Sequence, residues 1–227
     1  FKYCGFLIMI LSKMKRIILL TFILVNILSV SAFGQARLSL KFSPLVTSNR
    51  VTFSSDTLSI SNDGLNPRFS LGLIVDKPIT DTYSFSTGLV YLPKGVSIST
   101  NGSNGGSFRV DEEYRLQYLQ IPLTFKLFTN EVHPGLKIYF QVGGGLEVLL
   151  HDEPRNDDFE VVEDFSFFDA SVILGGGVEY KLGSSTILYG GISYQRGLIN
   201  IINETISLEN DLEIRNTVVS LDLGIKF

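Results

Sequence analysis

The sequence is poor in the residues that most often carry catalysis and metal binding. It has no tryptophan, two histidines and a single cysteine, Cys4, which precedes the expected start of the mature chain. A mature chain without cysteine forms no disulfide, holds no thiolate metal site and offers no acylation site for a lipoprotein anchor. After residue 34 there is also no apolar run of the roughly 20 residues that a membrane-spanning helix needs.

Positive charge is also scarce in the mature part. Lys2, Lys13, Lys15 and Arg16 are the only charged residues before Gln35, so the remainder holds 15 basic and 23 acidic residues, a net charge of −8. An acidic surface argues against sequence-independent binding to a polyanion. We therefore expect no nucleic-acid partner.

The N-terminus has the three parts of a secretory signal peptide. Met14-Lys15-Arg16 is a basic start, residues 17–30 are mostly apolar, and Ala32-Phe33-Gly34 places small residues before Gln35. The alternative is a retained membrane helix, for which the apolar core is short. We predict an upstream extension plus cleaved signal peptide over residues 1–34, with Met14 as initiator, and one domain over residues 35–227.

The most informative stretch runs from Asp164 to Asn200. From Phe168 to Leu182 apolar residues occupy every second position, and Asp169, Glu179 and Lys181 lie on the other parity. Such alternation is typical of a strand with one apolar and one polar face. Gly183-Ser184-Ser185 then turns the chain. The length and the uninterrupted apolar parity predict a hairpin of a transmembrane β-barrel, with the apolar face in lipid.

The same alternation predicts eight strands in all. They are expected at 36–46, 68–76, 83–92, 118–127, 136–150, 168–182, 186–200 and 219–227, with the third running out to Pro93-Lys94-Gly95. Loops are expected at Thr47–Asn66, Asn101–Ser107, His151–Glu163 and Asn203–Asn216. Pro122 falls inside the fourth strand, where it is acceptable only at a bulge or a locally unpaired position.

The connections alternate between long and short, and the strand count is even. Both are typical of outer-membrane barrels, which have short periplasmic turns and long outer loops. We therefore predict an all-β, eight-stranded, antiparallel up-and-down transmembrane barrel in the outer membrane, with both termini periplasmic. A soluble lipocalin-like barrel is the alternative, with the two faces exchanged.

A barrel of eight strands has an interior just wide enough for side chains. Inward charges should then pair with one another, because an unpaired buried charge is very costly. The parity places five acids inside, Asp76, Glu147, Asp169, Glu179 and Asp222, and six cations that can balance them, Arg37, Lys41, Arg68, Lys137, Lys181 and Lys226.

Several segments resemble the PorT-like outer-membrane β-barrel family of Gram-negative bacteria. They are residues 88–95 (GLVYLPKG), 118–123 (YLQIPL), 175–180 (GGGVEY) and 193–201 (SYQRGLINI). The tyrosine–leucine–acid–isoleucine–proline segment is the most specific, and here Gln120 replaces the usual acidic residue. The resemblance implies an outer-membrane barrel without catalytic residues, in a family that includes a protein associated with a secretion and gliding apparatus.

Candidate chemistry in the sequence is weak. His151 at the outer end of the fifth strand is a conceivable general base for a lipid-modifying enzyme, but no serine lies at an obvious spacing. The acidic stretch 151–164 matches no calcium-loop pattern, and Gly143-Gly144-Gly145 and Gly175-Gly176-Gly177 lack the residues that follow a phosphate loop. We predict no catalytic, cofactor-binding or metal-binding residues, and expect the glycines to mark bends or close packing.

The sequence thus favours a non-enzymatic barrel with a structural or interaction role, such as an accessory of a surface secretion complex. The alternatives are an outer-leaflet lipid-modifying enzyme and a narrow channel. Expected partners are outer-membrane lipids and lipopolysaccharide, the barrel-assembly machinery and other envelope proteins. Phe227, the last residue of the closing strand, resembles the terminal signal presented to that machinery.

Overall fold

The structure is a computed structural model of the chain. It describes residues 36–52, 58–62, 64–102, 108–154, 162–183, 185–205 and 213–227. Contacts divide the chain into Phe1–Ala36 and Arg37–Phe227, and the description below concerns the second unit. The predicted signal peptide and initiator lie outside the described residues and stay predictions.

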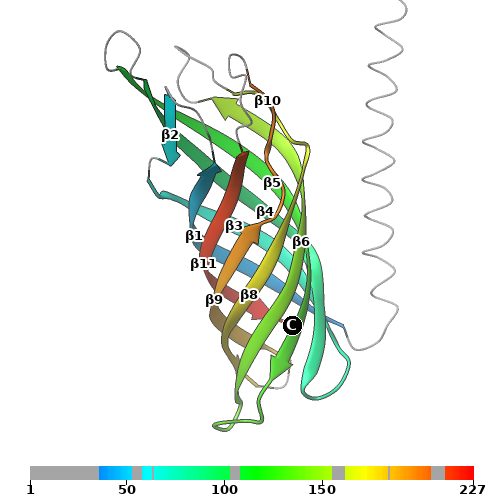
Figure 1. The fold of residues 1–227 in the computed structure, drawn as a ribbon. Coiled ribbons are helices and arrows are strands. Elements are labelled where there is room, and N and C mark those ends of the chain that lie inside the picture. Colours follow the sequence, from blue (N-terminus) through cyan, green and yellow to red (C-terminus); the bar gives the residue numbers. More distant parts are fainter. Residues whose placement is uncertain are drawn as a thin grey trace, which may run out of the picture. The chain divides into compact units, whose positions relative to one another are not determined.

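The described residues of the second unit form eleven strands (Figure 1). They are β1 (Arg37–Thr52), β2 (Leu58–Asn62), β3 (Asn66–Pro78), β4 (Tyr83–Gly102), β5 (Phe108–Phe128), β6 (Leu136–Pro154), β7 (Val162–Phe165), β8 (Phe168–Lys181), β9 (Ile187–Gly197), β10 (Ile202–Thr205) and β11 (Glu213–Lys226).

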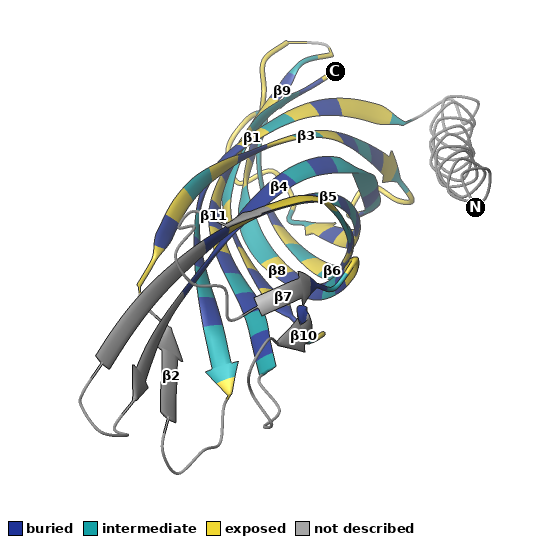
Figure 2. Cartoon of the chain, turned by 90° about the horizontal axis from the view of Figure 1, so that it is seen from above, coloured by how far each residue is buried: buried dark blue, intermediate teal, exposed yellow. Residues whose placement is uncertain are grey.

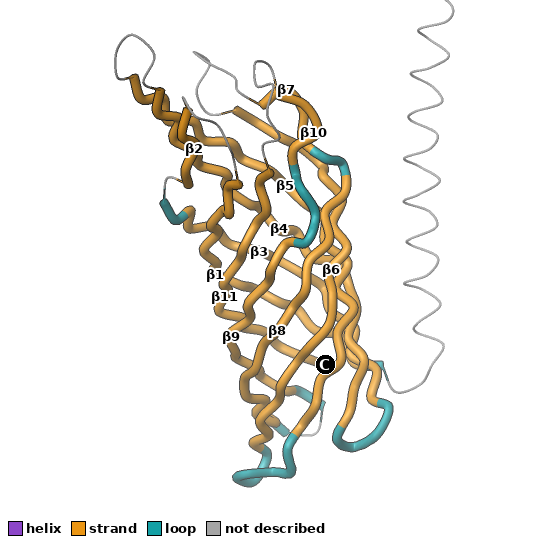
Figure 3. Tube along the Cα trace, viewed as in Figure 1, coloured by secondary structure: helices purple, strands orange, loops and turns teal. Residues whose placement is uncertain are grey.

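Eight of these strands close into an antiparallel barrel. Each pairs with the next in the order β1, β3, β4, β5, β6, β8, β9 and β11, and β11 returns to β1 through pairs such as Leu40 with Ile225. The predicted eight-stranded up-and-down barrel is therefore confirmed. We call the end that carries the short connections and Phe227 the turn end, and the opposite end the loop end (Figure 3).

The two faces of the wall are those that the alternation predicts. Large apolar side chains point outward, with Phe140 60% and Ile192 63% exposed, whereas Lys94, Glu147 and Lys226 are at most 2% exposed. Figure 2 shows buried and exposed residues alternating along the barrel strands. A soluble barrel would bury its apolar face, so this distribution rules out the lipocalin-like alternative.

The strands run further toward the loop end than the sequence predicts. β1 continues to Thr52, β6 to Pro154, and β11 already begins at Glu213. Three short strands also lie within or at the edge of predicted loops. β2 pairs with the part of β4 nearest the loop end, and β7 pairs with β10 in a separate two-stranded sheet. The sequence did not predict these strands, because their segments are polar and the alternation of apolar and polar residues is weak beyond the apolar belt.

The expected end of the third strand at Pro93-Lys94-Gly95 is wrong. β4 leaves β3 after the pair Leu71 with Tyr91 but stays paired with β5 as far as Gly102. After Tyr91, side chains of β1 form hydrogen bonds with the β4 backbone. The Gly95 amide donates to Thr47 Oγ1 (3.1 Å), and the Gly95 carbonyl accepts from Asn49 Nδ2 (3.1 Å). A proline is tolerated there because the ladder on the β3 side has already ended.

Pro122 occupies a half-paired position, as expected. It is in register with Gly145 of β6, but in this described part of the wall it has no pair on the β4 side, where pairing skips from Leu123 to Gln120.

Glycines on β8 and β9 provide space for the inward side chain of Tyr139. A Cβ on Gly191 would lie 2.6 Å from the Tyr139 hydroxyl, and one on its partner Gly177 would lie 2.9 Å from the Tyr139 ring. The prediction of close packing for the glycine triplets is confirmed at Gly177.

Candidate functional site in the barrel lumen

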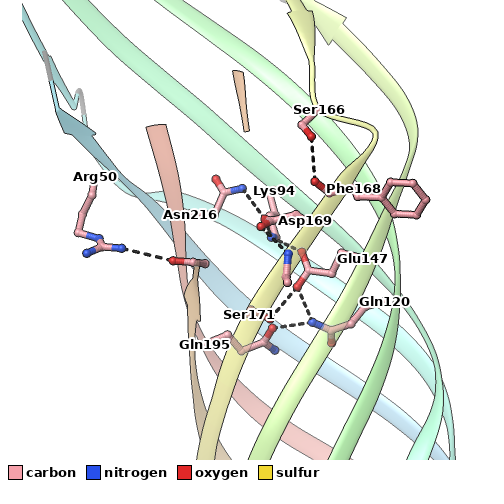
Figure 4. Close-up of polar contacts among 12 residues, drawn as sticks. Arg50, Lys94, Gln120, Glu147, Ser166, Phe168, Asp169, Ser171, Gln195 and Asn216 are labelled. Carbon is pink, nitrogen blue, oxygen red and sulfur yellow. Dashed lines mark hydrogen bonds and ion pairs between the residues drawn. The ribbon is translucent and has the colours of Figure 1, made fainter. Parts of the chain in front are cut away.

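The lumen is crossed by a polar network centred on Lys94. Its ammonium group forms ion pairs with Glu147 of β6 and with Asp169 Oδ2 of β8 (2.9 Å), and it lies 4.8 Å from the centre of the Tyr118 ring. Figure 4 shows the side chains of Lys94, Glu147 and Asp169 converging with those of Ser171, Gln195 and Asn216, which come from three different strands. Buried ion pairs persist only when further hydrogen bonds complete their shells, and here neighbours supply them.

Gln120 takes part in this network, and it is the residue at which segment 118–123 departs from the PorT-like pattern that it resembles. Its Nε2 donates to Glu147 Oε1 and to Gln195 Oε1, each at 2.8 Å. A carboxylate at this position would place a third negative charge beside Glu147 and Asp169 and would donate no hydrogen bond. The amide therefore suits a site in which Lys94 already balances two acids.

A second charged group lies toward the turn end. Asp76 of β3 accepts from Lys126 (3.0 Å) and pairs with Lys226 (2.5 Å), and it also accepts from Ser86. Lys226 reaches Glu179 of β8 at 2.7 Å. The group thus contains two acids and two cations, so its net charge is zero.

Between these groups Lys41 of β1 pairs with Asp222 of β11 at 3.0 Å. The Asp222 carboxylate also accepts from Ser43 (2.8 Å) and Ser220 (2.9 Å). This contact links the first and last strands of the barrel from within, so it supports closure as well as neutralising charge.

The predicted inward acids are all buried and paired, but the choice of cations was partly wrong. Lys41 and Lys226 pair as expected, whereas Arg37 and Lys181 are exposed and Arg68 and Lys137 half-buried. Lys94 and Lys126 take their place. Lys94 was missed because β4 was expected to end there. Ser84, Ser86 and Val90 point inward, and the same alternation continued for four more residues predicts that Lys94 points inward too.

An apolar plug fills the lumen at the loop end. We define it as the buried cluster Val96, Tyr114, Leu116, Tyr118, Phe165, Ile201, Ile202 and Ile214. Phe165 comes from β7 and Ile202 from β10, and the Phe165 ring packs edge-on against Tyr114 with centroids 5.2 Å apart. Backbone bonds from Ser166 to Ile201 (2.8 Å) and from Ile201 to Ile214 (3.0 Å) tie the small sheet to β11.

Two cavities are lined by described residues of the lumen. One interior cavity of about 40 Å³ lies among residues that include Lys41, Thr124 and Tyr139, which is room for one or two water molecules. A larger cavity of about 460 Å³ occupies the turn end, lined by charged residues such as Arg37, Lys137 and Lys181 together with Phe227.

The sequence-derived candidates for chemistry are dispersed. His151 is exposed and lies in register with Gln117 of β5, next to a bulge in the β5–β6 ladder, and His133 is exposed in the connection before β6. Most of the acidic stretch 151–164 lies outside the described residues or has no described side chains. Within the described ranges, no three His, Cys, Asp or Glu side chains are grouped so as to hold a metal ion.

No helix in the described part of the chain is long and apolar enough to span a membrane.

Comparison with known proteins places this geometry in a family. No curated protein matches the chain. Among solved structures, OprG of Pseudomonas aeruginosa has 14% identity and a TM-score of 0.51, over 85% of this chain and 97% of that one. Neisserial surface protein A has 13% identity and a TM-score of 0.47 over 85% and 97%, and the outer membrane protease OmpT of Escherichia coli has 9% and 0.49 over 86% and 96%.

At such low identity, the likeness to OprG shows the fold alone. A sequence model described as outer membrane protein beta-barrel domain matches residues 33–203. This match covers most of the chain, whereas the narrower PorT-like assignment stays a prediction. The chain therefore belongs to the outer membrane protein beta-barrel domain family, as an integral barrel of the outer membrane.

Proposed function

We propose that this protein is a non-enzymatic, non-conducting barrel that anchors an interaction surface at the outside of the cell. The loop end faces outward and both termini lie in the periplasm, because short turns are periplasmic in outer-membrane barrels. The observation that carries the proposal is the filled lumen: the apolar plug and the Lys94 network lie in successive layers across it.

A filled lumen leaves the loop end as the part available for recognition. There β4 and β5 continue past the barrel wall, paired with each other through to Gly102 and Phe108, and β2 adds a strand along β4. In the described chain, the segment Phe108–Glu113 of β5 pairs on its β4 side only. An open strand edge supports binding of an extended partner segment by strand addition. The partner class expected from the sequence, another envelope protein such as a secretion component, fits this mode.

Bilayer recordings test the absence of conduction. Purified protein in planar bilayers should show no discrete channel steps, since water and ions would have to pass the apolar plug. Replacing Leu116 and Ile214 of the plug with Ala should leave the Lys94 network in place and serve as the opened comparison. Reproducible steps in the unaltered protein would overturn the non-conducting role.

Truncation of the β4–β5 extension tests the interaction surface. Residues 100–110 are replaced by an Asn-Gly turn, which joins the register partners Ser99 and Asp111. Folded yield should stay unchanged, while proteins crosslinked to the barrel in intact cells should be lost. Deletion of residues 155–160 is the matched control and should keep those crosslinks. An unchanged crosslinking pattern after hairpin truncation would contradict the proposal.

A further inference from the structure

Three arginines lie on the outer face of the wall at the loop end. Arg50 on β1, Arg196 on β9 and Arg215 on β11 each occupy the parity opposite to the buried positions of their strand. The strands are neighbours in the order β1, β11, β9. Figure 4 shows Arg50 apart from the Lys94 network, with its guanidinium directed to the backbone of β9. We call Arg50, Arg196 and Arg215 the rim arginines.

The register brings these like charges together. Arg50 and Arg215 are directly opposite each other in the β1–β11 ladder, and Arg196 is in register with Thr217, two residues along β11 from Arg215. Like charges directly opposite across strands destabilise a sheet. The described chain offers one compensating carboxylate, Glu213, which pairs with Arg215 at 3.0 Å, so the group keeps a net charge of +2.

On β1 and β11 the rim arginines lie beyond the apolar belt, whereas at the end of β9 the exposed Leu198 follows Arg196. Tyr194 lies two residues before Arg196 on β9, on the side of the turn end. It pairs with Leu174 of β8 and Val219 of β11, and all three side chains are exposed. An outward tyrosine between aliphatic residues is typical of the membrane interface. Arginine on the lipid face costs little at that depth, in contrast to the midplane, so the guanidinium groups lie at headgroup level.

Several donors of the rim arginines have no protein partner. The Nε atoms of Arg50 and Arg215 are buried without a hydrogen bond in the described chain, and Arg50 Nη2 makes only a long bond of 3.4 Å to the Gly197 carbonyl. Arg196 is exposed, and among the described residues its guanidinium group has no hydrogen bond or ion pair. Planar guanidinium groups bind phosphate oxygens through paired hydrogen bonds.

We propose that the rim arginines form a docking site for the phosphorylated headgroup of an outer-leaflet lipid, whose acyl chains lie along the adjoining apolar belt. The inference rests on the proposed orientation of the barrel, which places the loop end in the outer leaflet. A bound phosphate neutralises the Arg50–Arg215 repulsion and accepts hydrogen bonds from the exposed guanidinium group of Arg196. The belt below Arg196 supplies the apolar contact that a soluble phosphate lacks.

Native mass spectrometry of the detergent-solubilised barrel tests the site, with titration of lipid A, dephosphorylated lipid A and inorganic phosphate. Lipid A should bind, and the Arg50→Gln/Arg196→Gln/Arg215→Gln variant should lose about tenfold or more in affinity. Arg115→Gln is the matched control, because Arg115 is an exposed outward arginine on β5, and its affinity should be unchanged.

Three results would overturn the site. They are equal affinity of the triple variant, equal binding of the dephosphorylated lipid, and full competition by millimolar inorganic phosphate, which would make the ligand a free anion. If the triple variant does not fold, Arg196→Gln is measured alone, since its guanidinium supports no contact in the described chain, and a loss of affinity is again required. Failure here leaves the conductance and crosslinking tests of the proposed function unaffected.

Discussion

Glu147 and Asp169 lie directly opposite each other in the β6–β8 ladder, both buried, and Lys94 reaches them from β4 across the lumen. Two carboxylates at such a position repel each other and have lost their hydration. The ammonium group of Lys94 neutralises this repulsion. It also connects β4 to β6 and β8, which are not its neighbours in the barrel.

The first prediction is that Lys94→Met destabilises the barrel by about 3 to 5 kcal/mol, because it leaves two buried carboxylates without a cation. Urea unfolding in micelles measures the change. The triple variant Lys94→Met/Glu147→Gln/Asp169→Asn removes all three charges at similar volume and should recover most of the loss. If the triple variant is as unstable as Lys94→Met, packing and not charge explains the effect.

The second prediction separates two adjacent glycines. Gly191→Ala should destabilise by about 1 to 3 kcal/mol through overpacking, since the added methyl group would meet the Tyr139 hydroxyl and the Gly176 carbonyl, each at 2.6 Å. Gly190→Ala faces outward, with its nearest contact at 3.6 Å to Leu223, and should be nearly neutral. Equal stability of the two variants in urea would mean that the wall relaxes around Tyr139.

The third prediction compares neighbours on opposite faces of β8. Glu179→Leu removes a carboxylate that neutralises Lys226 and should cost roughly 3 kcal/mol. Val178→Leu lies on the lipid-facing side, 43% exposed, and should change little. Because Asp76 keeps Lys126 as a partner, the additional variant Glu179→Leu/Lys226→Met leaves one acid and one cation and should regain stability. Similar losses for Glu179→Leu and Val178→Leu would contradict the assignment of faces.

The fourth prediction concerns the end of the chain. Phe227 follows β11, is 56% exposed, and its amide donates to the Leu38 carbonyl at 2.8 Å. If Phe227 is a terminal assembly signal, adding a few polar residues after it should reduce the folded fraction in outer-membrane preparations, although every strand contact stays intact. Heat-modifiable gel migration reports that fraction.

Deletion of Phe227 is the companion variant. A loss on deletion with normal yield on extension would identify Phe227 as a packing residue only. Normal yield for both forms would reject the signal role.

The sequence by itself determined which side chains share a face of the wall, and the structure decided that the apolar face is the outer one. Successive residues of a strand point to opposite sides, so the parity of Leu38 and Leu40 against Ser39, or of Val178 against Glu179, follows from local order alone. The number of barrel strands and the sequence of short and long connections followed in the same way, because an apolar belt of fixed height imposes a similar run of alternation on every strand.

Only the tertiary structure decided which residues meet. Which residues meet across a barrel depends on the register of every strand pair between them. A local sequence pattern does not specify these registers. Lys94 therefore meets Glu147 and Asp169 while Arg37 and Lys181 stay exposed, and Arg50 comes to lie opposite Arg215 although 165 residues separate them. The apolar plug could not be predicted from the sequence for the same reason. Phe165, Ile201 and Ile214 come from three separate segments, which meet at the loop end only when the barrel is closed.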